Sequence, residues 1–110
     1  MANKINLTID QGTDYAAIMI FNDASGNPHD ITDWDFSGYV KESYDDTSIL
    51  AEFTIEKTDA ENGIISMSLT EADTKLFSGS AFLCDIMTTY SGTTHKVAYG
   101  VANINRSVTL

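Results

Sequence analysis

The sequence predicts an all-β domain, a sandwich of about seven short antiparallel strands with one short helical turn. Three observations support this prediction. Apolar and polar side chains alternate with a period of two in several segments, beginning with Lys4-Ile5-Asn6-Leu7-Thr8-Ile9-Asp10. Glycine, asparagine, aspartate or serine bounds each of these segments. The length of 110 residues fits a single domain, which we expect to span residues 1–110.

The first two predicted strands cover residues 4–10 and about 14–22. In the first, Ile5, Leu7 and Ile9 share one face, which we expect to be buried. The second is apolar on both faces, so one of its two sets of side chains needs further cover. The stripe on one face is therefore either core or a protein interface. Its members are Tyr15, Ala17, Met19 and Phe21, of which Tyr15, Met19 and Phe21 are the candidate interface residues.

Two strands are predicted in the middle of the chain, after a loop at 23–28 that is rich in turn residues. One covers residues 31–41, and Trp34 on its apolar face is the expected core anchor because an indole buries a large area. The other covers residues 49–56 and places Phe53 in the core. Asn62-Gly63 is a tight-turn signal, so this strand should form a hairpin with a strand at 64–69.

In the last third of the chain, the sequence predicts a helical turn and a final hairpin. Thr70 can cap a short helix that ends near Gly79. Strands are expected at 80–89 and 96–104, joined by a turn at 90–93, and the segment 106–110 either continues the last strand or forms a tail.

Composition and charge narrow the class of protein. Sixteen acidic residues against six basic ones give a formal charge of −10, which would repel a nucleic acid. No signal peptide or membrane span is expected, so we predict a soluble protein made in a cytoplasm, with no membrane or nucleic-acid partner. The only cysteine, Cys84, has apolar neighbours and is predicted to be buried.

The residue types available for chemistry favour a protein that is not an enzyme and carries no cofactor. His29 and His95 fall in or beside predicted loops, and nothing in the pattern places either beside a nucleophile and an orienting acid. We expect both to be solvated loop histidines. The sequence contains no glycine-rich phosphate loop.

Clusters of acids offer the best candidates for a metal site. Asp30, Asp33 and Asp35 could supply oxygen ligands to calcium, although their spacing differs from that of an EF-hand. The alternative is that they form turns by bonding to their own backbone, and we therefore predict no metal. Weaker candidates are Asp45 with Asp46 and Asp59 with Glu61.

Exposed aromatic rings are the candidates for a glycan site, because sugars stack on flat side chains. The available rings are Tyr39, Tyr44, Tyr90 and Tyr99. Tyrosine is also an ordinary residue of half-buried strands, so both interpretations stay open.

Four stretches of the chain carry a family resemblance: NLTIDQGTDY, DASGNPHDITDWDFSGYVKES, AEFTIEKTDAENGIISMSLTEADTKLFSG and AFLCDIMTTYSGTTHKVAYGVANI. In this order they resemble the small immunoglobulin-like β-sandwich modules of tailed-phage virions, including the amino-terminal domain of the upper baseplate protein and cyanophage structural proteins. The matching positions are Gln11-Gly12, Gly26-Asn27-Pro28 with Ile31-Thr32, Leu69-Thr70, and Asp85. The chain departs from the modules that carry a basic strand after Trp34, since it has only Lys41 there.

The resemblance implies an immunoglobulin-like fold and a role as a non-enzymatic structural protein of a virion. Tail, baseplate and capsid-associated positions are all compatible with it. The implied partners are copies of the chain and neighbouring virion proteins, which makes the protein an oligomer or an assembly component. The alternative function is a glycan-binding adhesion module of a virion or a cell surface.

Overall fold

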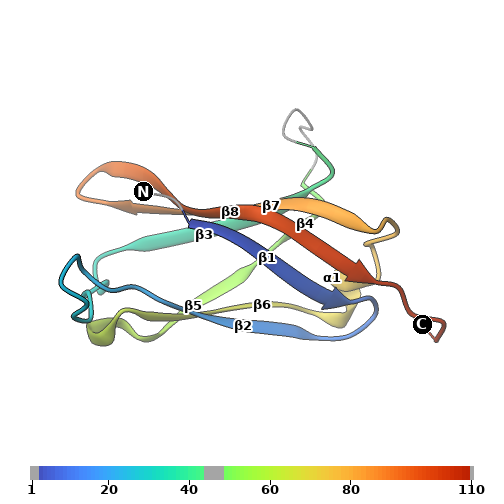
Figure 1. Ribbon diagram of the computed structural model, residues 1–110, viewed down its shortest axis with the longest axis horizontal. Helices are drawn as coiled ribbons and strands as arrows, with labels where there is room; N and C mark the ends of the chain where they lie inside the picture. The colour runs from blue at the N-terminus through green and yellow to red at the C-terminus, as the bar shows by residue number, and fades with distance from the viewer. Residues whose placement is uncertain (1–2, 44–48, 110) are drawn as a thin grey trace.

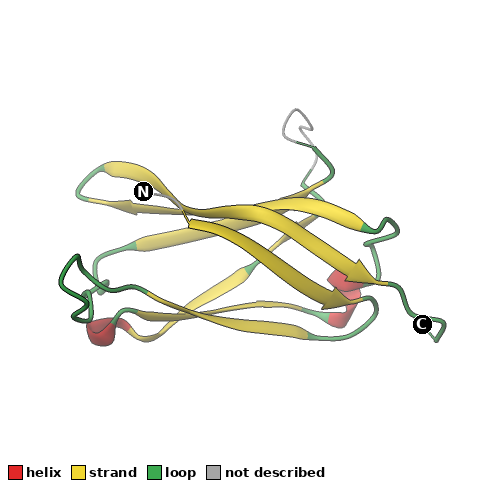
Figure 2. Ribbon diagram, viewed as in Figure 1, coloured by secondary structure: helices red, strands yellow, loops and turns green. Residues whose placement is uncertain are grey.

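The structure is a computed structural model that describes residues 3–43 and 49–109, and it consists of two β-sheets packed face to face (Figure 1). The strands are β1 (Asn3–Asp10), β2 (Tyr15–Ile20), β3 (Asp35–Lys41), β4 (Ala51–Glu52), β5 (Thr54–Asp59), β6 (Ile64–Leu69), β7 (Ala81–Tyr90) and β8 (Thr93–Asn105). Two short helices, η1 (Ala60–Asn62) and α1 (Glu71–Thr74), lie at opposite ends of the sandwich (Figure 2). The predicted sandwich of two sheets is confirmed.

The larger sheet has the strand order β1-β8-β7-β3-β4, and the smaller has the order β2-β6-β5. Neighbouring strands are antiparallel except for β1 and β8, which run parallel with Ile5 opposite Gly100. The expectation of purely antiparallel strands is therefore wrong at this pairing. Alternation of side chains reports which face of a strand is buried, but it carries no information about the direction of the neighbouring strand.

The predicted strand at 49–56 is divided between the two sheets. Its first part, β4, pairs with β3, and its second part, β5, pairs with β6. Between them, the backbone N–H of Phe53 donates a hydrogen bond to the carbonyl of Gly38 at 2.9 Å. The side chain of Phe53 is 4% exposed, as predicted for a core residue. A strand that crosses between sheets keeps its period of two, so the sequence pattern does not reveal the break.

The core lies between the inner faces of the two sheets. Phe82, Cys84 and Ile86 point inward from β7, and the burial of Cys84 is as predicted. The other buried members of the core cluster are Ile9, Val40, Ala51, Phe53, Met67, Leu69, Phe77, Ala98, Ala102 and Ile104. Burial of this set supplies the main driving force for folding.

The predicted turns and helix form with minor shifts. Gly63 takes a left-handed conformation with φ of 72° between η1 and β6, which closes the β5–β6 hairpin. Ser91 and Gly92 have φ of 52° and 76°, which suits the tight turn between β7 and β8. Thr70 caps α1 in a reciprocal capping box with Asp73, but the helix ends at Thr74 and not near Gly79.

A buried glutamine ties one end of the sandwich together. The Gln11 side-chain amide donates to the carbonyl of Phe77 at 3.1 Å, and its oxygen accepts from the N–H of Ser107 at 3.2 Å. The Thr74 hydroxyl donates to the carbonyl of Thr13 at 2.7 Å. The loop after β1, helix α1 and the residues after β8 are thus held as one unit. Residues 106–109 form a tail and do not extend β8.

Trp34 is half-buried at the other end of the sandwich and precedes β3, so its prediction as a core anchor inside a strand at 31–41 is wrong. The N–H of Trp34 donates to the carbonyl of Ile31 at 3.0 Å, which makes a turn. The Lys57 ammonium donates to the carbonyls of Thr32 and Trp34 at 2.7 and 2.9 Å and stabilises that turn. Within the turn at 31–34, the fully buried residue is Ile31.

Candidate functional site

The outer face of the three-stranded sheet carries exposed apolar side chains on β2. Ile18 and Ile20 are 70% and 59% exposed, and Ala16 is exposed on the same face. We call these three residues the β2 strip. Their neighbours on β6 are the small Ser66 and Ser68 and the half-buried Ile64. Small neighbours leave the isoleucines standing above the sheet, where they are available for contact with another molecule.

The opposite phase of β2 faces the interior. Tyr15, Ala17 and Met19 pack against the core cluster. The ring of Phe21 lies 5.7 Å from the ring of Trp34, inside the aromatic cluster at the end of the sandwich. The expectation that Tyr15, Met19 and Phe21 form an interface is therefore corrected: the core alternative applies to Tyr15 and Met19, and Phe21 packs in the aromatic cluster with Trp34. The side chains of Tyr15, Ala17 and Met19 lie on the inner face of the sheet, and those of the β2 strip therefore lie on its outer face.

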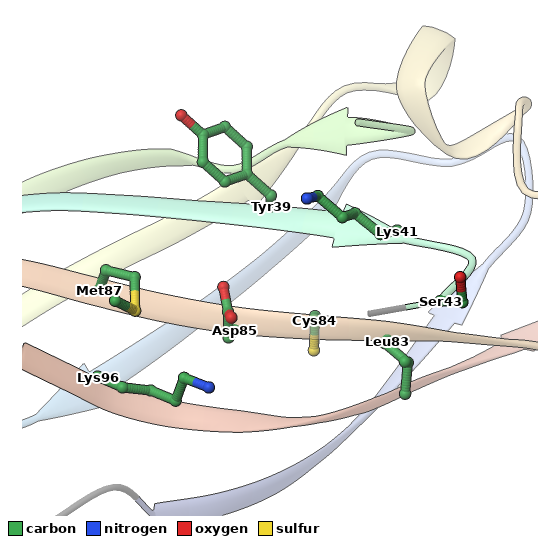
Figure 3. Close-up of a pocket in the computed structure, with 8 residues that line it drawn as sticks. All are labelled: Tyr39, Lys41, Ser43, Leu83, Cys84, Asp85, Met87 and Lys96. Carbon is green, nitrogen blue, oxygen red and sulfur yellow. The ribbon is translucent and has the colours of Figure 1, made fainter. Parts of the chain in front are cut away.

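The outer face of the five-stranded sheet contains a shallow groove of about 330 Å³ (Figure 3). Its lining comes from three adjacent strands, β3, β7 and β8, and from the residues that follow β3. The lining residues are Tyr39, Lys41, Ser43, Leu83, Cys84, Asp85, Met87 and Lys96. All of these residues except Ser43 belong to strands.

One carboxylate of the groove, that of Asp85, lies between two half-buried tyrosines, of which Tyr39 lines the groove and Tyr99 is its neighbour on β8. Asp85 lies opposite Tyr39 on β3 and opposite Tyr99 on β8. Directly opposite residues on adjacent strands have side chains about 5 Å apart at Cβ, so the three side chains form one row across the sheet. This row can accept hydrogen bonds at the carboxylate and stack a flat or apolar group on the rings.

Lysines stand around this row. Lys4 lies opposite Tyr99, and Lys96 lies opposite Met87. Lys41 lies opposite Leu83 on the next row. These lysines share the outer face of the five-stranded sheet with Asp10, Asp35, Glu52 and Asp85, so this face carries charges of both signs.

The end of the sandwich near Trp34 holds a stack of rings. Trp34 stacks on Tyr90 with ring centroids 4.4 Å apart, and His95 stacks on Tyr90 at 4.8 Å. Since β7 lies between β3 and β8, the two neighbours cover opposite faces of the Tyr90 ring. Tyr90 therefore offers no free face to a sugar. Of the other candidate rings, Tyr39 and Tyr99 lie on the groove side, and Tyr44 lies outside the described residues.

The histidines contact aromatic rings. His29 lies in a loop, as predicted, and its ring is 4.8 Å from that of Trp34. His95 is exposed but belongs to β8, so its prediction as a loop residue is wrong. Both imidazoles pack on aromatic rings, His29 on Trp34 and His95 on Tyr90, and these contacts give them a packing role.

The Cys84 thiol is buried and protonated at neutral pH. Burial raises its pKa to about 11, and the neighbouring charge of Asp85 adds to the rise. The reactive form of cysteine is the thiolate, so this thiol is a poor nucleophile. Its prediction as a buried structural residue is confirmed.

Two of the acidic candidates, Asp30 and Asp59, serve turns, and Asp35 is the first residue of β3. A carboxylate oxygen of Asp30 accepts hydrogen bonds from the N–H and the hydroxyl of Thr32 at 3.0 and 2.6 Å. These bonds hold the pKa of Asp30 below its ordinary value. Asp59 accepts from the side-chain amide of Asn62 at 2.9 Å, and Asp45 and Asp46 lie outside the described residues. Across residues 3–43 and 49–109, no three histidine, cysteine, aspartate or glutamate side chains gather into a potential metal site.

Sequence reasoning missed the groove on the five-stranded sheet. Lys41, Asp85 and Lys96 are far apart in the chain, and only the register of β3, β7 and β8 brings them together. The available signal was that Tyr39 and Lys41 share the outward phase of one strand, as do Asp85 and Met87 of another. No helix in the described part of the chain has the length and apolar content that crossing a membrane would require.

No family model and no curated protein matches this sequence. Among solved structures, the Lin-41 filamin domain is similar with a TM-score of 0.53 and 17% identity, over 91% of this chain and 84% of that chain. A chain from the structure of ICOS in complex with ICOS-L and an anti ICOS-L VNAR domain matches with a TM-score of 0.46 and 10% identity, over 96% of this chain and 56% of that chain. At these identities the likeness is one of fold. The chain is an immunoglobulin-like β-sandwich.

Proposed function

We propose that the chain is a non-enzymatic structural protein of a phage particle, in its tail, baseplate or capsid-associated layer. It acts through contacts with copies of itself and with neighbouring virion proteins. The observation that carries the proposal is the β2 strip, in which Ile18 and Ile20 are 70% and 59% exposed on the outer face of the three-stranded sheet. Exposed apolar side chains grouped on one face are typical of protein contact surfaces. The phage assignment rests on the family resemblance.

Charge makes such a contact selective. The chain carries a formal charge of −10, so most approaches between two copies or between the chain and another acidic protein are opposed. The segment 15–22 contains no charged residue. Two chains that meet at this segment bring no like charges of the segment together. Electrostatic repulsion therefore favours association here over association at the acidic parts of the surface.

The phage assignment is tested on purified particles. Particles from a host that carries the gene are separated on a density gradient, and the protein is followed with a specific antibody. We expect it to sediment with intact particles at a constant ratio to the major capsid protein, and gold-labelled antibody to mark one layer of the virion. Its absence from gradient-purified particles would contradict the assignment.

A second candidate function is glycan binding at the groove of the five-stranded sheet. The observation that favours it is the row Tyr39–Asp85–Tyr99, where two half-buried rings flank a carboxylate that can accept hydrogen bonds from hydroxyl groups. A glycan array with the wild-type chain and with Asp85→Asn tests it. Binding that is lost in Asp85→Asn but kept in the outer-face control Asn103→Ala supports this function, and an array without a bound glycan contradicts it.

A further inference from the structure

We propose that β2 pairs antiparallel with β2 of a second copy of this chain, so that two three-stranded sheets join into one continuous sheet across a two-fold axis. This inference rests on the proposed function and names the partner of the β2 strip. Three observations support it: β2 is the sheet edge without protection against pairing, its free backbone groups point away from β6, and its charges do not oppose a second copy.

The four sheet edges differ in how they are protected against pairing. β4 is only two residues long. β5 carries Glu56, Lys57 and Asp59 and has a register shift between Glu56 and Asp59. β1 carries charges near both ends, at Lys4 and Asp10. Short length, charge and irregularity are the usual means by which proteins block an edge.

The edge of β2 has none of these protections. Its sequence, Tyr15 to Ile20, contains no charge and no proline, and it pairs with β6 in unbroken register. An apolar, regular and unprotected edge strand is a template for another strand. Because the other edges of the same molecule are blocked, the open edge at β2 marks a site of pairing.

The backbone groups that point toward this free edge can be identified. The N–H of Phe21 donates to the carbonyl of Gly63 at 2.8 Å, so Phe21 directs its N–H toward the β6 side. Backbone groups alternate along an antiparallel strand. Ala16, Ile18 and Ile20 therefore direct their N–H and C=O groups away from β6. No hydrogen bond recorded between described residues outside the β2–β6 ladder involves these groups.

The same three residues carry the outward side chains of β2. A second strand that formed hydrogen bonds with the backbone groups of Ala16, Ile18 and Ile20 would also lie beside the side chains of Ile18 and Ile20. The same pairing would therefore satisfy the free backbone groups and bury apolar surface. With the two-fold axis at Ile18, Ile18 lies opposite Ile18 of the second copy. Ala16 then lies opposite Ile20 of the second copy, and each small side chain meets a large one.

Charge favours a second copy of the chain over an unrelated acidic strand. In the register centred on Ile18, Asp14 lies opposite the neutral Asn22 and Asp23 lies opposite Thr13. No two acidic residues between positions 13 and 23 face one another, whereas like charges directly opposite would destabilise the pair. The strand is thus complementary to itself within a chain of charge −10.

The test is sedimentation equilibrium of the whole chain over a range of concentrations, together with three variants. We expect the wild-type chain to dimerise. Ile18→Lys places a charge at the two-fold axis, and Ala16→Pro removes an N–H that points to the free edge. We expect each to raise the dimer dissociation constant at least tenfold. Thr54→Lys adds the same charge to the same face at the opposite edge and should dimerise like the wild type.

Thermal unfolding of dilute samples checks that the variants are folded, and the two edge variants act by different means, so loss of the fold in one leaves the other as the test. A wild-type chain that stays monomeric to millimolar concentration would overturn the inference. So would a folded Ile18→Lys or Ala16→Pro variant that dimerises like the wild type. A monomeric chain that is still found in particles would overturn edge pairing and leave the proposed function standing with a foreign partner.

Discussion

The backbone of Ile5 passes so close to Gly100 that a side chain at position 100 would run into the Ile5 carbonyl. The two residues are opposite partners in the parallel pairing of β1 with β8. A glycine at this point is what lets β1 pair with β8 at the edge of the five-stranded sheet. The packing of β1 therefore depends on a contact between residues that are far apart in the sequence.

We predict that Gly100→Ala displaces β1 from β8 and lowers the free energy of unfolding by about 1–3 kcal/mol, the usual cost of forcing atoms into a filled space. Urea denaturation followed by circular dichroism gives the stability, and amide exchange along β1 reports its detachment. Gly92→Ala is the control, because position 92 has open space and only an unfavourable φ of 76°. It should lose some stability without faster exchange in β1. Equal exchange in the two variants would contradict the role of Gly100.

Phe53 and Trp34 differ in how deeply their side chains are buried. Phe53 is buried between the sheets, so Phe53→Ala should cost about 3–5 kcal/mol in the free energy of unfolding. Trp34 is half-buried at the end of the sandwich, so Trp34→Ala should cost clearly less. Denaturant titration of both variants measures the difference. If Trp34→Ala proved the more damaging substitution, the assignment of the core would be wrong.

Stability should fall at alkaline pH because of groups on the inner side of the sandwich. Burial raises the pKa of Cys84 to about 11, and burial followed by the nearby Cys84 also raises the pKa of Tyr15. In the unfolded chain a thiol ionises near pH 8.5. The unfolded state therefore loses its proton first, and stability is full below about pH 8.5 and declines up to about pH 11, by at most about 1.4 kcal/mol per pH unit for each group.

The measurement is the urea midpoint at a series of pH values from neutral to alkaline. Cys84→Ala should flatten the decline over the lower part of this range, and Tyr15→Phe should flatten its upper part. A decline of unchanged slope in Cys84→Ala would show that the buried thiol is not its cause.

Divalent cations should leave the stability unchanged. The carboxylate of Asp30 already accepts hydrogen bonds from the N–H and the hydroxyl of Thr32, so it serves the turn. Thermal scans with added calcium and with a chelator should give the same Tm. Asp30→Asn can keep the turn through its amide oxygen and is the matched variant. A rise of several degrees with calcium that disappears in Asp30→Asn would contradict the turn assignment.

The local features of the fold were accessible from the sequence because they depend on neighbours in the chain. The Asn62-Gly63 turn, the cap at Thr70 and the burial of Cys84 all follow from adjacent residues. Two errors came from the same source. Trp34 continues the alternation of β3 but lies in a turn, and the alternation through Phe53 hides a change of sheet.

The surfaces were harder to predict because they depend on register and on which phase of a strand faces inward. The sequence showed that β2 is apolar on both faces, but only the packing of Tyr15 and Met19 against the core identifies Ile18 and Ile20 as the outer set. The Tyr39–Asp85–Tyr99 row likewise requires the pairing of β3, β7 and β8. The pattern within a strand therefore shows which side chains share a face. Only the tertiary structure shows which of the two faces is buried.

Residue-resolved amide hydrogen exchange at two protein concentrations tests most directly whether the free edge of β2 is the site of association. We predict that the N–H groups of Ala16, Ile18 and Ile20 exchange slowly in concentrated samples and rapidly in dilute ones, because only the dimer gives them partners. The N–H groups of Ala17 and Met19 belong to the ladder with β6 and should be protected at both concentrations. Rapid exchange at Ala16, Ile18 and Ile20 in a concentrated sample that is dimeric by sedimentation would contradict pairing at this edge.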